Sequence, residues 1–328
     1  MIAAILTSFV VSLGLSLLLA HARGHWQILD IPNQRSLHTR PTPRTGGIAI
    51  LLGCAAALSV AWFTQEILIA GTSLLAAITL LAIVALIDDR HTLGAGPRLL
   101  IQIIAVSLLL FTPASPPLAI LTQVIALLFL VWMINLYNFM DGMDGFAGGM
   151  AVIGFASFAL LAWQAGNMEF ALGCAVIVAA AAGFLLLNFP PARLFMGDTG
   201  STVLGLLAGV VILYAHSEAI LPVWLGLLVF SPFIVDASVT LATRILRGEQ
   251  FWKPHKTHYY QKLVQIGWGH KRTVLAEYVL MSAAGGTAVV AADQSLAHQT
   301  VIIAGWAVLY AILIYLIHRA EQHREPLS

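Results

Sequence analysis

Long apolar stretches recur along the whole chain, and most are close to the length that a helix needs to cross a bilayer. About 30 Å of hydrocarbon requires roughly 20 residues at the helical rise. A shorter stretch lies at 98–111, and the longer ones lie at 1–20, 46–63, 68–87, 118–138, 147–163, 170–187, 200–215, 219–243, 273–291 and 299–318. Backbone polar groups cannot go unpaired in lipid, and no stretch alternates like a barrel strand. We therefore expect an all-α membrane bundle of about eleven helices.

Composition agrees with lipid as the main solvent of this chain. Hydrophobic residues make up 59% of the sequence and charged residues only 9%, against about 25% charged residues in soluble domains. The net charge of +1 gives no reason to expect a nucleic-acid partner. We see no internal repeat or linker, so we expect a single domain that spans residues 1–328.

The basic residues occupy alternate loops of this bundle. If the N-terminus is outside and every stretch crosses once, the inner loops are 21–45, 88–98, 139–146, 188–199, 244–272 and 319–328. These six loops contain all 16 Lys and Arg residues. The positive-inside rule therefore predicts an external N-terminus and a cytoplasmic C-terminus.

Acidic residues lie at the ends of the apolar stretches, where a carboxylate near the membrane interior needs a compensating role. Asp88 and Asp89 are adjacent at the end of the third stretch. Neighbouring carboxylates repel one another unless a cation or a shared proton compensates, which makes the pair suitable for a metal ion or for general-base chemistry. The same pair could instead form a solvated helix cap.

The segment 138–145 contains two further aspartates, Asp141 and Asp144. A spacing of three residues places both on one face of a helix, and the glycine after each allows a ligand to approach the backbone. A glycine-rich turn at the membrane surface would have the same sequence.

The segment 188–201 leads directly into the next apolar stretch and carries Gly197, Asp198 and Gly200. Backbone N–H groups at the start of that helix could bind phosphate oxygens, and Asp198 could hold a divalent cation against them. The alternative is a simple helix cap.

The loop 244–272 carries seven Lys or Arg residues and three histidines. His255 and His258 lie among Lys253, Lys256 and Lys262, which is typical of an anion or pyrophosphate clamp. A basic surface loop beside anionic lipid would have a similar composition.

Asp236 lies eight residues before Arg244, about 12 Å inside the end of the predicted helix. A carboxylate at that depth is a functional candidate, and it could equally be a structural partner for a neighbouring helix.

Taken together, these motifs resemble the polyprenyl-phosphate N-acetylhexosamine-1-phosphate transferases, which include the enzymes that start O-antigen synthesis. The resemblance runs from about residue 35 to 265 and covers five motifs in order. They are 41–47, the Asp88-Asp89 pair, 138–145, 188–201 and the histidine segment 254–263.

The resemblance implies transfer of N-acetylhexosamine 1-phosphate from a UDP-sugar to undecaprenyl phosphate with release of UMP. It implies a bacterial inner-membrane enzyme whose active site faces the cytoplasm and depends on Mg²⁺, with Mn²⁺ as a substitute. The implied catalytic and metal-binding residues are Asp88, Asp89 and Asp198, with His258 as a further catalytic residue. The implied substrate-binding residues are Arg44, Asn138, Asp141, Asp144, Asn188, Phe195 at the uracil, His255 and Lys256. Whether the chain forms a homodimer stays open.

The histidine segment departs from the form common among antigen-initiating enzymes. It keeps Pro254, His258 and Leu263, but it has His255, Tyr260 and Gln261 where Asp, His and His would stand. The triple histidine of the phospho-N-acetylmuramoyl-pentapeptide transferase of peptidoglycan synthesis is also absent. That enzyme is therefore the less favoured alternative. The form here is more similar to the subgroup that begins O-antigen chains with N-acetylfucosamine, N-acetylquinovosamine or N-acetylglucosamine.

A secondary transporter is the rival from another functional class, because it would also be a helix bundle with acidic residues. Transporters usually place their binding groups near the midplane, on broken helices. Here the acidic motifs lie at the predicted cytoplasmic ends, which favours the enzyme.

Overall fold

The computed structural model describes residues 1–22, 28–32, 37–64, 71–91, 93–111, 120–250 and 255–323, and this part of the chain is almost entirely helical. Pro254 and Lys253 of the predicted clamp lie outside it. The helices are α1 (Ile2–His21), α2 (Gly46–Phe63), α3 (Thr72–His91), α4 (Ala95–Leu110), α5 (Ile120–Met140), α6 (Phe146–Gln164), α7 (Met168–Asn188), α8 (Gly197–Ser217), α9 (Val223–Val229), α10 (Ser231–Leu246), α11 (Tyr259–Leu263), α12 (Gly269–Ala291) and α13 (Leu296–Gln322). Strands β1 (Leu29–Asp30) and β2 (Thr42–Pro43) pair antiparallel, and a π-helical segment (Val264–Trp268) joins α11 to α12.

The predicted all-α membrane bundle is confirmed. Within the described residues, nine helical segments are long and apolar enough to cross a membrane, and the bent pair α9 and α10 would make a tenth. The shorter stretch expected at 98–111 is the 16-residue helix α4.

The apolar stretch predicted at 219–243 forms two helices instead of one, because the chain bends by 87° between α9 and α10. The reason lies in Pro232, which has no N–H to donate to the carbonyl of Leu228. The hydroxyl of Ser231 donates to that carbonyl instead, at 2.7 Å. The seven residues of α9 rise only about 10 Å, so α9 cannot cross a bilayer alone.

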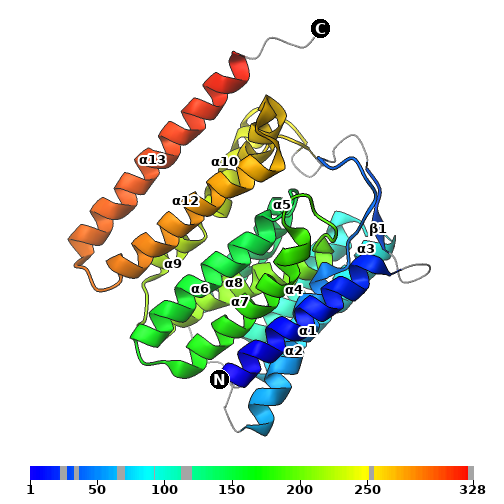
Figure 1. The fold of residues 1–328 in the computed structure, drawn as a ribbon. Helices are drawn as coiled ribbons and strands as arrows, with labels where there is room; N and C mark the ends of the chain where they lie inside the picture. The colour runs from blue at the N-terminus through cyan, green and yellow to red at the C-terminus, as the bar shows by residue number, and fades with distance from the viewer. Residues whose placement is uncertain are drawn as a thin grey trace.

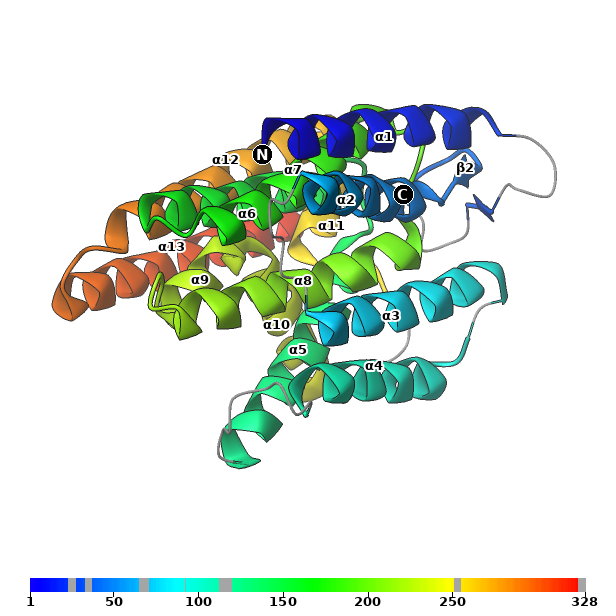
Figure 2. The same ribbon diagram turned by 90° about the horizontal axis from the view of Figure 1, so that it is seen from below.

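Helix α8 forms the centre of the bundle and is buried along most of its length, with α2, α3 and α5 packed around it (Figures 1 and 2). Helix α1 lies against α2 and α7, and its buried hydroxyls of Ser8 and Ser12 donate to the backbone carbonyls of Val176 and Ala180 in α7. Helices α12 and α13 form a hairpin at one side of the bundle, where most of α13 is exposed (Figure 1).

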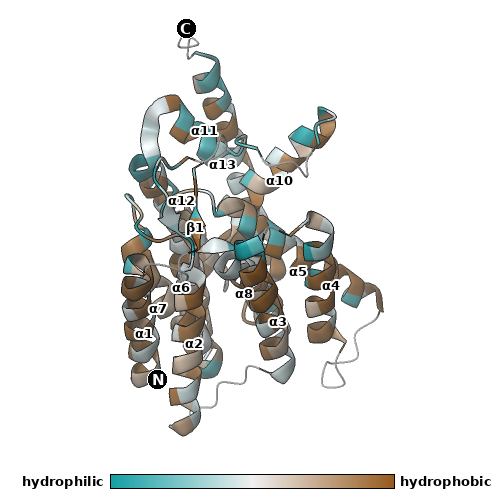
Figure 3. Cartoon of the chain, turned by 90° about the vertical axis from the view of Figure 1, so that its right-hand side faces the viewer, coloured by the Kyte–Doolittle hydropathy of each residue, from teal (hydrophilic) through white to brown (hydrophobic). Residues whose placement is uncertain are grey.

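Polar residues collect at one end of the bundle. Figure 3 shows the hydrophilic residues around β1, α11 and the end of α10, whereas the long flanks of α1, α2 and α3 are mainly hydrophobic. The carboxyl ends of α3 and α5 and the amino end of α8 reach the same end, so the three acidic motifs of the sequence lie there together.

Helices α2 and α8 approach so closely that a side chain would not fit between them. A Cβ on Gly47 would lie 2.2 Å from the backbone nitrogen of Gly200 and 2.5 Å from its Cα. Backbone atoms inside two packed helices cannot move away cheaply, so Gly47→Ala should destabilise the protein by about 1–3 kcal/mol. Thermal unfolding in detergent measures this.

Gly286→Ala in α12 is the matched control, because a Cβ there meets nothing within 4 Å. This variant should keep the wild-type unfolding temperature or raise it slightly, since alanine is the better helix former. Equal unfolding temperatures for the two variants would contradict the close packing of α2 on α8.

Candidate active site

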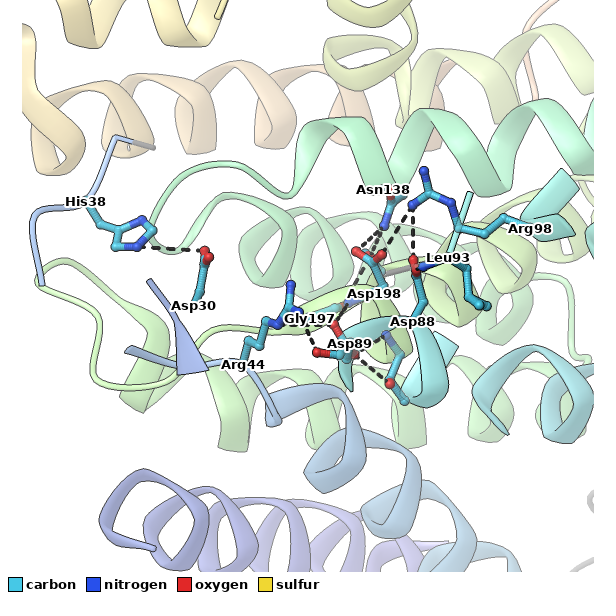
Figure 4. Close-up of polar contacts among 12 residues, drawn as sticks. Asp30, His38, Arg44, Asp88, Asp89, Leu93, Arg98, Asn138, Gly197 and Asp198 are labelled. Carbon is cyan, nitrogen blue, oxygen red and sulfur yellow. Dashed lines mark hydrogen bonds and ion pairs between the residues drawn. The ribbon is translucent and has the colours of Figure 1, made fainter. Parts of the chain in front are cut away.

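The amino end of α8 is capped by a carboxylate from another helix. Asp89, near the end of α3 and only 2% exposed, accepts hydrogen bonds from the backbone N–H of Asp198 at 3.1 Å and of Thr199 at 3.2 Å (Figure 4). It also accepts from the Thr199 hydroxyl at 2.9 Å. These N–H groups would otherwise lack partners, and a negative charge is favourable at that end of a helix. Asp89 thus occupies two of the N–H groups at the start of α8, and the predicted binding of phosphate at this helix start stays a prediction.

Arg44 holds Asp89 from the opposite side. Its guanidinium donates to the backbone carbonyl of Asp89, and its Nε lies 3.7 Å from the Asp89 carboxylate. The neighbouring backbone is close as well: the N–H of Gly47 donates to the carbonyl of Met196 at 2.7 Å. The proline-glycine motif at 41–47 therefore supports the turn before α8.

Asp88 and Asp198 converge on a single cation, Arg98 of α4. Arg98 Nη1 lies 3.1 Å from Asp88 and 3.5 Å from Asp198 (Figure 4). Asp88 is buried, whereas the Asp198 side chain is 32% exposed. Asn138 donates to Asp198 at 3.0 Å and to the Ser201 hydroxyl at 2.8 Å. Four of the predicted residues, Asp88, Asp89, Asn138 and Asp198, thus form one cluster.

Sequence reasoning did not single out Arg98. Its signal was present, since Arg98 is one of two basic residues in the predicted inner loop 88–98 and opens the shortest apolar stretch. Nothing in the sequence, however, indicated that α4 would place this side chain between two aspartates.

The cluster carries an excess of negative charge. Asp141, in the loop between α5 and α6, has a pKa raised to about 8 by burial and by the charges of Asp198, Asp89 and Asp30. Asp141 is therefore largely protonated at pH 7. The three carboxylates that pair with Arg44 and Arg98 are Asp88, Asp89 and Asp198, and they exceed these two cations by one charge when all are ionised.

A magnesium ion usually takes only one or two carboxylates from the protein and completes its shell with water and phosphate oxygens. Among the described residues, no group of three or more His, Cys, Asp or Glu side chains is arranged as a metal site. Asp88 and Asp198 nevertheless fit such a partial site, because both already face one cationic group. Asp89 fits it poorly, since both of its oxygens serve α8.

Asp144 and Asn188 join the loops around the cluster. Asp144 accepts from the backbone N–H of Ala192 at 3.0 Å and pairs with His270 of α12 at 3.1 Å. The Asn188 side chain accepts from the N–H of Gly145 and donates to the carbonyl of Leu194, each at 2.9 Å. Both side chains tie the segment 138–145 to the segment 188–201. Their predicted role in binding substrate stays a prediction, and these contacts give them a structural one.

The predicted clamp residues occupy a separate position, at α11. His258 pairs with Asp236 at 3.0 Å. His255 bonds to Thr257, and its pKa is lowered to about 4 by burial and by the charges of His258 and Arg244, so it is neutral at pH 7. His255 therefore adds no positive charge to a pyrophosphate clamp.

The remaining two substrate-binding predictions are less constrained by contacts. Lys256 is partly exposed, and its backbone carbonyl accepts from Gln265 at 2.9 Å. The ring of Phe195 is half-buried. Its centroid lies 4.9 Å from that of the His38 ring, and the two planes meet at 70°. Both predictions stay open.

A pocket opens beside the cluster between α3, α4, α5 and α8. Its polar lining comes partly from the cluster, with Asp88, Arg98, Asn138 and Asp198, and partly from Gln102, Asn135 and Thr202. Its apolar lining includes Leu81, Val84, Ala85 and Ile101. Because Leu81 precedes Asp88 by two helical turns, the pocket extends about 10 Å along the bundle from its charged end.

Comparison with known proteins identifies the family of this chain. The sequence pattern described as glycosyl transferase family 4 matches residues 71–216. The chain is 30% identical to a decaprenyl-phosphate N-acetylglucosaminephosphotransferase of Mycolicibacterium smegmatis, over 87% of this chain and 80% of the relative. The chain belongs to the polyprenyl-phosphate N-acetylhexosamine-1-phosphate transferase superfamily.

Two further relatives have different printed activities. A probable undecaprenyl-phosphate N-acetylglucosaminyl 1-phosphate transferase of Bacillus subtilis is 27% identical over 77% of this chain and 74% of its own length. A phospho-N-acetylmuramoyl-pentapeptide-transferase of Geobacillus thermodenitrificans is 32% identical over 71% of this chain and 78% of its own. The resemblance inferred from the motifs is confirmed.

The two aspartates at the amino end of α8 should differ in their effect on stability. Asp89→Ala leaves two buried N–H groups and a hydroxyl without their acceptor, so it should lower the free energy of unfolding by at least about 2 kcal/mol. Asp198→Ala removes a partly exposed charge beside Asp88 and should leave stability unchanged or raise it. Thermal unfolding of both variants in one detergent tests this, and a larger loss for Asp198→Ala would contradict the cap.

Proposed function

We propose that this chain transfers N-acetylhexosamine 1-phosphate from a UDP-sugar to undecaprenyl phosphate and releases UMP. The observation that carries the proposal is the convergence of Asp88 and Asp198 on Arg98 at the charged end of a pocket whose lining is partly apolar. The superfamily, whose members named above act on polyprenyl phosphates, supports the same chemistry.

The pocket suits the acceptor, which has an anionic head and an apolar chain. Arg98 can pair with the acceptor phosphate because a guanidinium matches phosphate oxygens. The first isoprene units would then lie along Leu81, Val84 and Ile101, away from the charged cluster. Polyprenyl phosphate is thus bound with its phosphate beside Asp88.

The donor pyrophosphate lies on the other side of Asp198 in this proposal. Asp198 and Asp88 would hold Mg²⁺ or Mn²⁺, which offsets the negative charge of the phosphate oxygens. Asp88 orients the acceptor phosphate, whose oxygen attacks the phosphorus attached to the sugar. The bond from that phosphorus to the bridging oxygen breaks, and UMP leaves with the bridging oxygen. Asp89 supports this geometry by holding the start of α8.

The histidine segment favours a role in O-antigen initiation over peptidoglycan synthesis. Gln261 accepts from the His258 backbone N–H at 3.2 Å, and the Tyr260 ring is buried 4.7 Å from the Phe146 ring. These two side chains serve the internal packing of the segment, so a triple-histidine site is not formed here. Assays with UDP-N-acetylglucosamine and with UDP-N-acetylmuramoyl-pentapeptide separate the two roles, and turnover of the pentapeptide donor alone would favour peptidoglycan synthesis.

The nucleotide product tests the reaction directly. The purified protein should release UMP from its UDP-sugar in the presence of undecaprenyl phosphate and Mg²⁺, and added UMP should reverse the reaction. Asp198→Asn should lower kcat by at least about a hundredfold, because the neutral amide binds a divalent cation weakly. UDP as the sole nucleotide product, or full activity in EDTA, would contradict the mechanism.

The donor is a cytoplasmic metabolite in this proposal, so the charged end of the bundle must face the cytoplasm. In a chain carrying Cys54→Ala and Cys174→Ala, an impermeant thiol reagent added to whole cells should label Asn167→Cys, which lies at the start of α7. The same reagent should not label Lys256→Cys until the cells are opened. External labelling of position 256 would reverse the orientation and remove access to the donor.

A further inference from the structure

Asp236 of α10 accepts hydrogen bonds from four donors although it is only 8% exposed. One oxygen accepts from His258 Nδ1 at 3.0 Å, from the Tyr259 N–H at 3.0 Å and from the Thr240 hydroxyl at 3.2 Å. The other oxygen accepts from the Tyr260 N–H at 3.0 Å. A buried carboxylate with this many partners is well compensated, and removing it would strand several donors at once.

This arrangement depends on the bend between α9 and α10. A straight helix would place Asp236 within the membrane interior, whereas the bent pair places it against α11. Helix α11 has only five residues and begins at Tyr259, so the carboxylate satisfies its first two N–H groups. Asp236 therefore anchors the histidine segment to α10.

The contact with Asp236 also determines which nitrogen of the His258 ring carries a hydrogen. A nitrogen 3.0 Å from a carboxylate oxygen must carry the hydrogen, so Nδ1 is protonated and Nε2 is the nitrogen left for another partner. The ring stacks on Tyr260, with centroids 5.8 Å apart and planes at 20°. His258 is thus fixed in both orientation and tautomer.

The same segment lies beside the loop that carries Asp141. The Tyr260 hydroxyl reaches the carbonyl of Phe139 at 3.5 Å, and it would lie 2.2 Å from a Cβ on Gly142. The histidine segment therefore packs against the loop that carries Asp141.

We propose that Asp236 is a positioning residue that fixes His258 so that its Nε2 meets the phosphate groups of the nucleotide donor. The inference rests on the proposed function and adds to it a residue that does not touch substrate itself. The alternative is that Asp236 only anchors the segment, in which case its effect would not pass through His258.

A double-mutant cycle separates these two roles, with kcat/KM for UMP release measured for each protein. Asp236→Asn keeps the shape of the side chain but removes its charge and leaves one acceptor oxygen for four donors. It should lower kcat/KM about tenfold in the wild-type background and less than about twofold when His258→Ala is already present. Thr243→Val, on the same helix, should keep wild-type kinetics because that hydroxyl bonds only to the Val239 carbonyl.

Two variants of His258 sharpen the test. His258→Asn places an amide nitrogen near Nδ1 and so keeps the contact with Asp236, but it lacks Nε2. His258→Gln places an amide nitrogen near Nε2 and loses that contact. The glutamine variant should retain several-fold more activity than the asparagine variant, and Asp236→Asn should no longer affect it.

Equal losses from Asp236→Asn with and without His258 would overturn the inference, since the residue would then be an anchor alone.

Should Asp236→Asn fail to fold, Asp236→Glu keeps the charge and displaces it by one methylene, and the same non-additivity is expected. Hydrogen exchange at the Tyr259 and Tyr260 amides reports on the anchor without any activity, and unchanged exchange in the variants would also overturn the inference. A wild-type protein that releases no UMP would reject the proposed function, whereas UMP release with an additive cycle would reject this inference alone.

Discussion

The cap that Asp89 places on α8 is the interaction on which the charged end of the protein depends. It joins the end of one buried helix to the start of another, and it fixes the position of Asp198 through that residue's own N–H. The contact is strong because a carboxylate meets both the partial positive charge of a helix start and the guanidinium of Arg44. Without it, buried N–H groups and a buried carboxylate would each lack a partner in a region with little water.

The same principle organises the rest of this end of the bundle. Side chains here bind backbone groups that are distant in sequence: Asn188 binds Gly145, Asp144 binds Ala192, and Asp236 binds the start of α11. These bonds satisfy backbone groups that would otherwise be unpaired, so the loops need little regular structure of their own. Asp198 and Arg98 do not use all of their hydrogen-bonding capacity within the protein. They are also the most exposed side chains of the charged cluster. Structural and chemical roles are therefore divided between neighbouring aspartates.

Asp88 and Asp89 illustrate this division. They are adjacent in sequence, yet one faces Arg98 and the pocket while the other faces the interior and α8. Successive residues on a helix point about 100° apart, so two adjacent carboxylates cannot serve the same small site equally well. Asp88 lines the pocket and Asp89 does not, while the predicted metal or base role of the pair stays a prediction. The histidines differ in a similar way, since His258 is held by Asp236 and His255 is neutral.

The sequence by itself determined that the chain lies in a membrane, where its helices fall, and which family it belongs to. Helix length and apolar composition are local properties, and so are the loop motifs that identified Asp198, Asn138 and the aspartate pair. Only the tertiary structure decided which groups meet: Arg98 beside Asp88, Asp89 at the start of α8, and Asp236 beneath His258. The bend at Pro232 shows the reason. The local pattern did not show the 87° bend between α9 and α10. Three of the four donors to Asp236 come from α11 and the residue before it, which lie more than twenty residues away in the sequence.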